Sequence, residues 1–150
     1  MRSKLKMMGA AAALLVAGAA AAEPAQRVAM PGPAYEILQA GPASGAHPTR
    51  ADTVRIRYVG RLATGDVFST SADEGRGTSD FPVKGVVPGF SALVQLMRPG
   101  DRWRFFLPSY LAYGAPGRRH QPPEPTLKRD VPPDSDLIFD VELVSITPPN

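Results

Sequence analysis

Three segments of the chain alternate apolar and polar residues, and this alternation restricts the possible folds more than any other feature. In "TVRIRYVGRL" (residues 53–62), every second residue from Val54 to Tyr58 is apolar, and arginines lie between them. "DRWRFFLP" (101–108) alternates in the same way, and "SDLIFDVELVSI" (135–146) is long and rich in β-branched residues. A period of two residues is typical of a strand with one buried face, as is common in antiparallel sheets.

Shorter segments add to the expected sheet. "AYEILQAG" (34–41) predicts a short strand, and "VFSTS" (67–71) follows a turn and predicts a returning strand of a hairpin. "FPV" (81–83) predicts only a strand fragment, because Pro82 lacks the N–H that a sheet uses. One helix is expected over 89–98. Together the segments predict an α+β fold, in which an antiparallel sheet of about five strands is wrapped around one short helix.

The N-terminal segment has the composition of a secretory signal peptide. Three basic residues precede a run of small apolar residues (7–22), which ends in an A-x-A cleavage pattern before Glu23. A membrane anchor is the alternative, but the run is shorter and richer in alanine than a spanning helix of about 20 strongly apolar residues. We therefore expect a signal peptide over 1–22, a flexible lead-in over 23–33 and one domain over 34–148. The cleaved protein is expected in the periplasm or outside the cell, with no membrane attachment.

Cleavage would change what the net charge implies. The whole chain has a formal charge of +3, but removing the three leader cations lowers Lys plus Arg from 17 to 14, which equals the 14 Asp plus Glu residues. A neutral domain gives little support to nucleic-acid binding. The lack of cysteine excludes disulfides, thiol catalysis and thiolate metal sites. Neither histidine belongs to a nucleophile triad pattern, and we find no clustered metal ligands and no phosphate-binding glycine loop. We expect neither a metal nor a cofactor.

Apolar side chains gather at chain reversals, where burial within one element is difficult. The plainest case is "VVPGF" (86–90), in which two valines and a phenylalanine surround a Pro-Gly pair. The wider set consists of Tyr58, Phe68, Phe81, Val86, Val87, Phe90, Tyr113 and Val131. Burial in a core would explain each of these residues taken alone. Taken together, they favour a concave apolar pocket with a few hydroxyl groups at its rim.

A long segment separates the last two expected strands. Residues 109–134 contain several prolines and a cluster of cations, and a loop of this length in a small domain is usually functional or disordered. Its centre, "RRHQPPEPTLKRD" (118–130), is expected to be solvated. Its ends are expected to be anchored by Tyr110, Tyr113 and Val131.

The chain contains four motifs in a fixed order: "YVGRLATGDVF", "FPVKGVVPGF", "LMRPGDRWRFFLPSYLAYG" and "VPPDSDLIFDVELVSI". Together they resemble the motifs of FKBP-type peptidyl-prolyl cis–trans isomerases, especially the exported bacterial enzymes of the macrophage-infectivity-potentiator kind. The likeness runs from about Tyr35 to Ile146. It implies a twisted antiparallel sheet curled around one short helix, with a ligand pocket between the helix and the sheet.

The resemblance also assigns roles to individual residues. The catalytic residues that it implies are Tyr58, Phe68, Tyr113 and Phe139. The substrate-binding residues that it implies are Phe81, Val86, Val87, Phe90, Val131 and Ser69. Phe90 occupies a floor position where the family usually has tryptophan, and Ser69 replaces an aspartate that usually follows the pocket phenylalanine. The loop over 115–130 is longer than in a compact member of the family, so no site residue is assigned there.

The function implied by the resemblance is prolyl isomerisation that assists the folding of exported proteins. Proline-containing polypeptides would be the clients, and macrolides would be further ligands of the pocket. Isomerisation needs neither a nucleophile nor a general acid or base, which agrees with the absence of such residue patterns from the sequence. One alternative is a weakly active or inactive binding module, or holdase, that grips unfolded clients; another is a structural domain with a filled pocket. The chain shows no long helical dimerisation segment before the domain, which favours a monomer.

Overall fold

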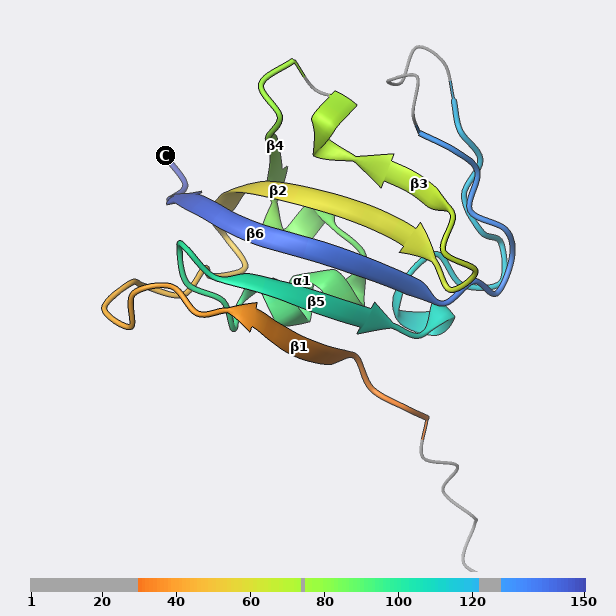
Figure 1. Ribbon diagram of the computed structural model, residues 1–150, viewed down its shortest axis with the longest axis horizontal. Coiled ribbons are helices and arrows are strands. Elements are labelled where there is room, and N and C mark those ends of the chain that lie inside the picture. The colour runs from red at the N-terminus through yellow and green to blue at the C-terminus, as the bar shows by residue number, and fades with distance from the viewer. Residues whose placement is uncertain (1–29, 74, 122–127) are drawn as a thin grey trace, which may run out of the picture. The chain divides into compact units, whose positions relative to one another are not determined.

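The computed structural model describes residues 30–73, 75–121 and 128–150, and within them six strands form one antiparallel sheet (Figure 1). The strands are β1 (Ala34–Gln39), β2 (Thr53–Leu62), β3 (Val67–Thr70), β4 (Ser79–Pro82), β5 (Arg102–Leu107) and β6 (Leu137–Thr147). Their order is β1-β5-β6-β2-β3, and β4 also pairs with β2. The α+β architecture with one short helix is therefore confirmed, with six strands in place of about five. The expected signal peptide and most of the lead-in lie outside the described residues.

The helix α1 (Pro88–Val94) lies against one face of the sheet (Figure 1) and is shorter than the predicted span of 89–98. Its start follows the sequence, because proline suits the first position of a helix. Beyond Val94 the backbone tightens into turns: the N–H of Leu96 donates to the carbonyl of Leu93, and that of Met97 donates to Val94. The residues after the helix therefore keep apolar contacts with the core without continuing the α-helical hydrogen bonds.

Strand β4 begins earlier than the predicted "FPV" fragment. Its residues from Ser79 to Pro82 pair with β2, and the chain leaves the sheet at Val83 as a 3₁₀ turn. Pro82 is the last residue of the strand, which agrees with its missing N–H. The polar residues before the proline were not recognised as strand, because Ser79 and Asp80 carry no apolar alternation.

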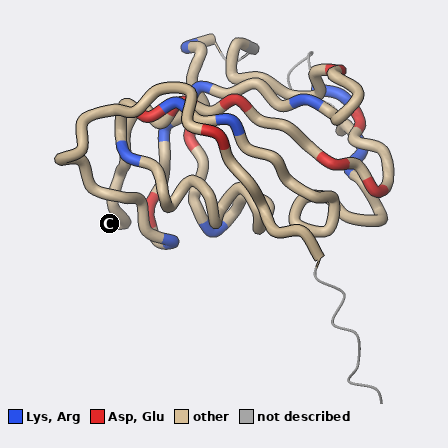
Figure 2. Tube along the Cα trace, turned by 60° about the horizontal axis from the view of Figure 1, so that its bottom comes forward, with Lys and Arg blue, Asp and Glu red and all other residues tan. Residues whose placement is uncertain are grey.

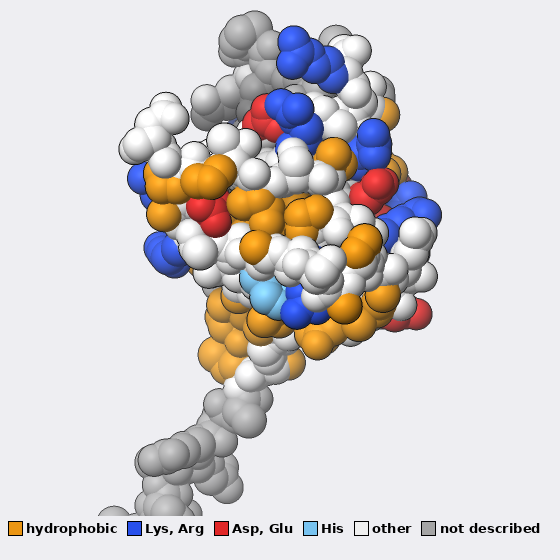
Figure 3. All heavy atoms as spheres, turned by 90° about the vertical axis from the view of Figure 1, so that its left-hand side faces the viewer, with side chains coloured by type: hydrophobic (Ala, Val, Ile, Leu, Met, Phe, Trp, Pro, Cys, Tyr) orange, Lys and Arg blue, Asp and Glu red, His pale blue; other side chains and the backbone are white. Residues whose placement is uncertain are grey.

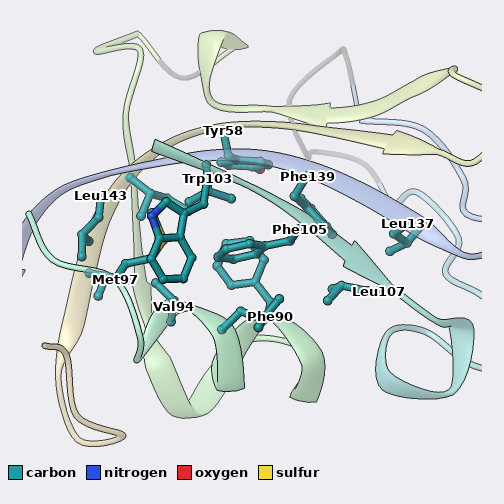
Figure 4. Close-up of a cluster of buried hydrophobic side chains, with 14 of the residues drawn as sticks. Tyr58, Phe90, Val94, Met97, Trp103, Phe105, Leu107, Leu137, Phe139 and Leu143 are labelled. Carbon is teal, nitrogen blue, oxygen red and sulfur yellow. The ribbon is translucent and has the colours of Figure 1, made fainter. Parts of the chain in front are cut away.

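The core lies between the sheet and α1 (Figure 4). The alternate apolar positions of these segments, from Val54 to Tyr58, from Trp103 to Leu107 and from Leu137 to Leu143, point into it: the side chains of Ile56, Phe105 and Leu143 have no exposed area. Phe90 and Val94 of α1 close the core from the opposite side. This burial confirms the faces predicted from the period of two.

The other face of the sheet carries charged side chains, and several of them form ion pairs. Arg104 and Arg61 both contact Asp140, at 2.7 and 3.3 Å, and Arg55 contacts Asp80 at 2.8 Å. Figure 2 shows acidic and basic residues side by side along these strands. On the face shown in Figure 3, hydrophobic, acidic and other atoms separate the basic side chains among the described residues. The face in Figure 3 shows no continuous basic surface in the described part of the chain.

Candidate functional site

A cavity of about 260 Å³ opens between α1 and the part of the sheet formed by β2, β3 and β6. Nine of the ten residues predicted as site residues line it: Tyr58, Phe68, Ser69, Phe81, Val86, Val87, Phe90, Tyr113 and Phe139. Ligand pockets for drug-sized molecules have volumes of roughly 300–1,000 Å³. A cavity slightly smaller than this range suits one side chain of a peptide together with part of its backbone.

The floor of the cavity is a cluster of aromatic rings centred on Phe139 of β6. The centroid of its ring lies 5.6 Å from that of Phe68 and 5.2 Å from that of Phe90, both in edge-to-face contact. The Tyr58 ring lies 6.3 Å away and also contacts Phe81 edge to face. Edge-to-face pairs fix ring orientations and add about 0.5–1.5 kcal/mol each beyond burial. The floor is therefore a rigid apolar surface made by five separate elements.

Gly60 makes room for this floor. It lies on β2 directly opposite Phe139 of β6, and a Cβ atom at this position would lie 2.8 Å from ring atoms of both Phe139 and Phe68. Such a separation is shorter than carbon atoms tolerate, so any larger residue would displace the two rings. A strand glycine often marks a close approach of this kind.

The "VVPGF" segment forms the wall on the helix side. Val86 and Val87 are half-buried and line the cavity, and Val87 is the N-terminal cap residue of α1. The first turn of α1 then carries Phe90 to the floor, and the N–H of Ser91 donates to the carbonyl of Val87. The apolar residues at this chain reversal are explained by the cavity that they border.

Hydroxyl groups provide the polar contacts of the wall. The hydroxyls of Tyr58 and Ser69 are hydrogen-bonded at 2.7 Å, and Ser69 is only 7% exposed. The Ser71 hydroxyl accepts the backbone N–H of Tyr58 at 3.0 Å. The serine that replaces the expected aspartate therefore holds the Tyr58 hydroxyl in place. Tyr113, which follows the 3₁₀ turn Ser109–Leu111, is half-buried and also lines the cavity.

Val131 is the one predicted site residue that does not line the cavity. Its side chain is 3% exposed and belongs to the core, and its backbone N–H and carbonyl pair with Arg118 in both directions. The structure thus places Val131 as an anchor of the long loop. The apolar character of Val131 alone could not show whether it anchors the loop in the core or lines the cavity.

Four residues line the cavity without having been predicted: Ile56, Gly85, Arg118 and Lys128. Ile56 lies on the same apolar face of β2 as Tyr58, so the alternation of this strand could have predicted that Ile56 lines the cavity. The centre of the long loop was expected to be solvated, yet Arg118 and Lys128 are half-buried and face the cavity. Nothing in the sequence indicated which basic residues of this loop would line the cavity.

The cavity has the composition of an apolar binding site. Aromatic and aliphatic side chains dominate its lining, and the lining contains no carboxylate. Among the described residues, no three His, Asp or Glu side chains lie close enough together to hold a metal ion. The carboxyl groups whose pKa values are lowered, Asp80 and Asp140, belong to ion pairs outside the cavity. In the described part of the chain, no helix has the length and hydropathy needed to span a membrane.

Comparisons with known proteins agree with this arrangement. Residues 44–144 match the family described as FKBP-type peptidyl-prolyl cis-trans isomerase. The FKBP-type 22 kDa peptidyl-prolyl cis-trans isomerase of Escherichia coli strain K12 is 40% identical over 102 residues, which cover 68% of this chain and 45% of that protein. The macrophage infectivity potentiator of Trypanosoma cruzi is 42% identical over 99 residues, 66% of this chain and 45% of that protein.

A solved structure gives the same result for the fold. The crystal structure of FkpA from Escherichia coli superimposes with a TM-score of 0.66 at 32% identity, over 78% of this chain and 49% of that one. The present chain therefore spans about half the length, or less, of each of these three proteins.

Proposed function

Because the chain belongs to the family of FKBP-type peptidyl-prolyl cis-trans isomerases, we propose that its cavity catalyses cis–trans isomerisation of X-Pro bonds in polypeptides. The observation that carries the proposal is the closed aromatic floor under a wall of half-buried valines. This surface is apolar, and a cavity of about 260 Å³ leaves room for a proline ring. The binding-module alternative gains no support, since the relatives above that carry an enzyme name are named as isomerases.

The reaction requires little chemistry from the protein. Amide resonance creates a barrier of about 18–20 kcal/mol, and an uncatalysed X-Pro bond isomerises in tens of seconds or more. A catalyst must bind the twisted amide better than either planar form. A dry cavity favours the twisted form, because the planar amide has the larger charge separation and loses more when water is removed.

We assign the roles of the site residues as follows. The rings of Phe139, Phe90 and Phe68 hold the proline ring, while the preceding carbonyl rotates above them. The Tyr113 hydroxyl donates a hydrogen bond to a substrate carbonyl. Tyr58, held by Ser69, presents a second hydroxyl at the wall. Macrolides that offer a similar ring and carbonyl groups are proposed as further ligands.

The place of action that we propose is outside the cytoplasm. The composition of residues 1–22, with basic residues before a small apolar run and an A-x-A pattern, supports export. The substrates would then be proline-containing polypeptides that fold after export, for which slow isomerisation limits the rate.

The direct test measures the isomerisation of a short X-Pro peptide by the purified protein. We expect catalysis that a macrolide inhibits and that a chelator leaves unchanged. Tyr113→Phe should lower kcat/KM without unfolding the domain, because it removes one hydroxyl and keeps the ring. A protein that is folded but leaves the uncatalysed rate unchanged with every peptide tested would refute the proposal.

A further inference from the structure

Two basic side chains border the proposed peptide cavity. Arg118 and Lys128 are half-buried and are the charged residues of its lining, which contains no aspartate or glutamate. They come from the two arms of the long loop between β5 and β6. A cavity with an apolar floor and a basic border is suited to a substrate with an apolar ring and a neighbouring negative charge.

Backbone hydrogen bonds hold Arg118 in this place. Its N–H donates to the carbonyl of Val131 at 2.9 Å, and the N–H of Val131 donates back at 2.7 Å. Val131 is itself buried in the core. Gly117 precedes this pair with a φ of +66°, and a Cβ atom there would lie 2.8 Å from the carbonyl carbon of Pro132. The backbone that carries Arg118 is thus a fixed part of the domain.

The other arm of the loop is anchored to the wall of the cavity. The N–H of Arg129 donates to the carbonyl of Phe68 at 2.8 Å, so the backbone next to Lys128 is tied to β3. Asp130 lies two positions after Lys128, and its carboxylate accepts the backbone N–H of His120 at 2.6 Å. Asp130 does not line the cavity. The two cations therefore line the cavity, whereas the Asp130 carboxylate binds a backbone N–H within the loop.

Building on the proposed isomerase function, we propose that Arg118 and Lys128 select polypeptides with an acidic residue next to the proline. The proline ring occupies the aromatic floor, and the neighbouring carboxylate lies between the two basic side chains at the border. Such pairs are partly solvated and screened by salt, so each contributes modestly. We expect the preference to appear as about a three- to tenfold increase in kcat/KM.

The test uses two pairs of short peptides that differ only by Glu or Gln, placed directly before the proline in one pair and directly after it in the other. Glu and Gln have nearly the same shape, so the ratio of their kcat/KM values isolates the charge. We expect a Glu:Gln ratio of about 3–10 for at least one pair at low salt, falling toward 1 at high salt. The double variant Arg118→Gln/Lys128→Gln should have a ratio near 1.

The matched control is Arg119→Gln. It removes the same charge from the same loop, but Arg119 is exposed and does not line the cavity, so the ratio should remain that of the unchanged protein. Lys128→Glu alone should lower the ratio and favour a peptide with Lys beside the proline. Because Lys128→Glu changes only one partly exposed residue, it tests the inference if the double variant does not fold.

The outcomes separate this inference from the proposed function. Equal rates for Glu and Gln peptides, or a Glu preference that survives in the double variant, would overturn the selection by these cations while leaving the isomerase intact. If no peptide is isomerised, the isomerase proposal fails. Selection by Arg118 and Lys128 is then tested by measuring how tightly the same peptides bind. In that measurement tighter binding of the Glu peptides that depends on Arg118 and Lys128 supports it, and equal Kd values overturn it.

Discussion

Ser69 illustrates how one side chain changes the electrostatics of the cavity. Its hydroxyl holds that of Tyr58, but it supplies no negative charge where a carboxylate is usual in the family. Ser69→Asp should keep the bond to Tyr58 as a stronger, charge-assisted one. For a neutral peptide we expect kcat/KM to rise about three- to tenfold, or about 0.7–1.4 kcal/mol.

The same substitution has a predictable cost. Ser69 is 7% exposed, so the new carboxylate is desolvated, and we expect the free energy of unfolding to fall by about 1 kcal/mol. Peptide kinetics and denaturant unfolding measure the two effects separately. An unchanged rate and an unchanged macrolide affinity in the folded variant would place Ser69 outside the working site.

Phe139 joins the stability of the domain to its proposed activity. Its ring contacts those of Phe68, Phe90 and Tyr58, and truncating a buried phenylalanine typically costs about 3–5 kcal/mol. We expect Phe139→Ala to lose this amount in denaturant unfolding and most of its isomerase activity. Phe106→Ala is a suitable control, because Phe106 is 39% exposed on β5 and should cost much less with activity retained. Equal costs for the two variants would contradict the role of Phe139 as the centre of the floor.

At the scale of elements, the strands with a clear period were predictable and the irregular segments were not. The predicted bounds of β2 are those observed, because alternating Val, Ile and Tyr leave one possible buried face. The end of α1 was misplaced, because Met97 still reaches the core although the chain has already left the α-helix in a turn. The loop around Arg118 was not predictable, since its shape depends on hydrogen bonds to Val131, thirteen positions later in the sequence. Nine cavity residues were accordingly found, whereas Arg118 and Lys128 of the loop were missed.

The polar face of the sheet gives the fold a pH dependence. The hydrogen bond from Arg104 is the main cause that lowers the pKa of Asp140 from its usual value of 3.8, and Arg61 adds to it. Because the folded pKa lies below the unfolded one, this stabilisation is complete above about pH 4–5 and is lost as the pH falls through the folded pKa. Asp140→Asn should therefore cost about 1 kcal/mol at pH 7, and the difference from the unchanged protein should shrink below pH 4.

Urea unfolding at a series of pH values measures this effect. Glu142→Gln is the matched control on the same strand, since it removes a single ion pair with Arg57 that is more exposed. It should cost less than Asp140→Asn at pH 7. A cost for Asp140→Asn that stays constant from pH 7 to pH 2 would show that the lost ion pairs are not its source.

For the whole molecule, the distribution of charge supports the proposal of export. The basic character of the chain comes from the three cations of the first six residues, and several charged residues of the described sheet form ion pairs with one another. An apolar cavity with a small basic border on a nearly neutral domain favours association with polypeptides over binding to nucleic acid. The charge of the leader is then explained by export, in which a basic N-terminus precedes the apolar run.

We therefore predict that the protein recovered from its native host begins near Glu23 and is found in the periplasmic or external fraction. The A-x-A pattern at residues 20–22 suits signal peptidase, and the composition changes abruptly at Glu23 and Pro24. Mass spectrometry of the intact protein determines the N-terminus, and cell fractionation determines the location. Replacing Ala20 and Ala22 by bulky residues should block cleavage and leave a longer chain held at the membrane, since the small-residue pattern is what the peptidase requires. Recovery of the chain with its first 22 residues from the cytoplasm would refute export, and the proposed clients would then have to be cytoplasmic polypeptides.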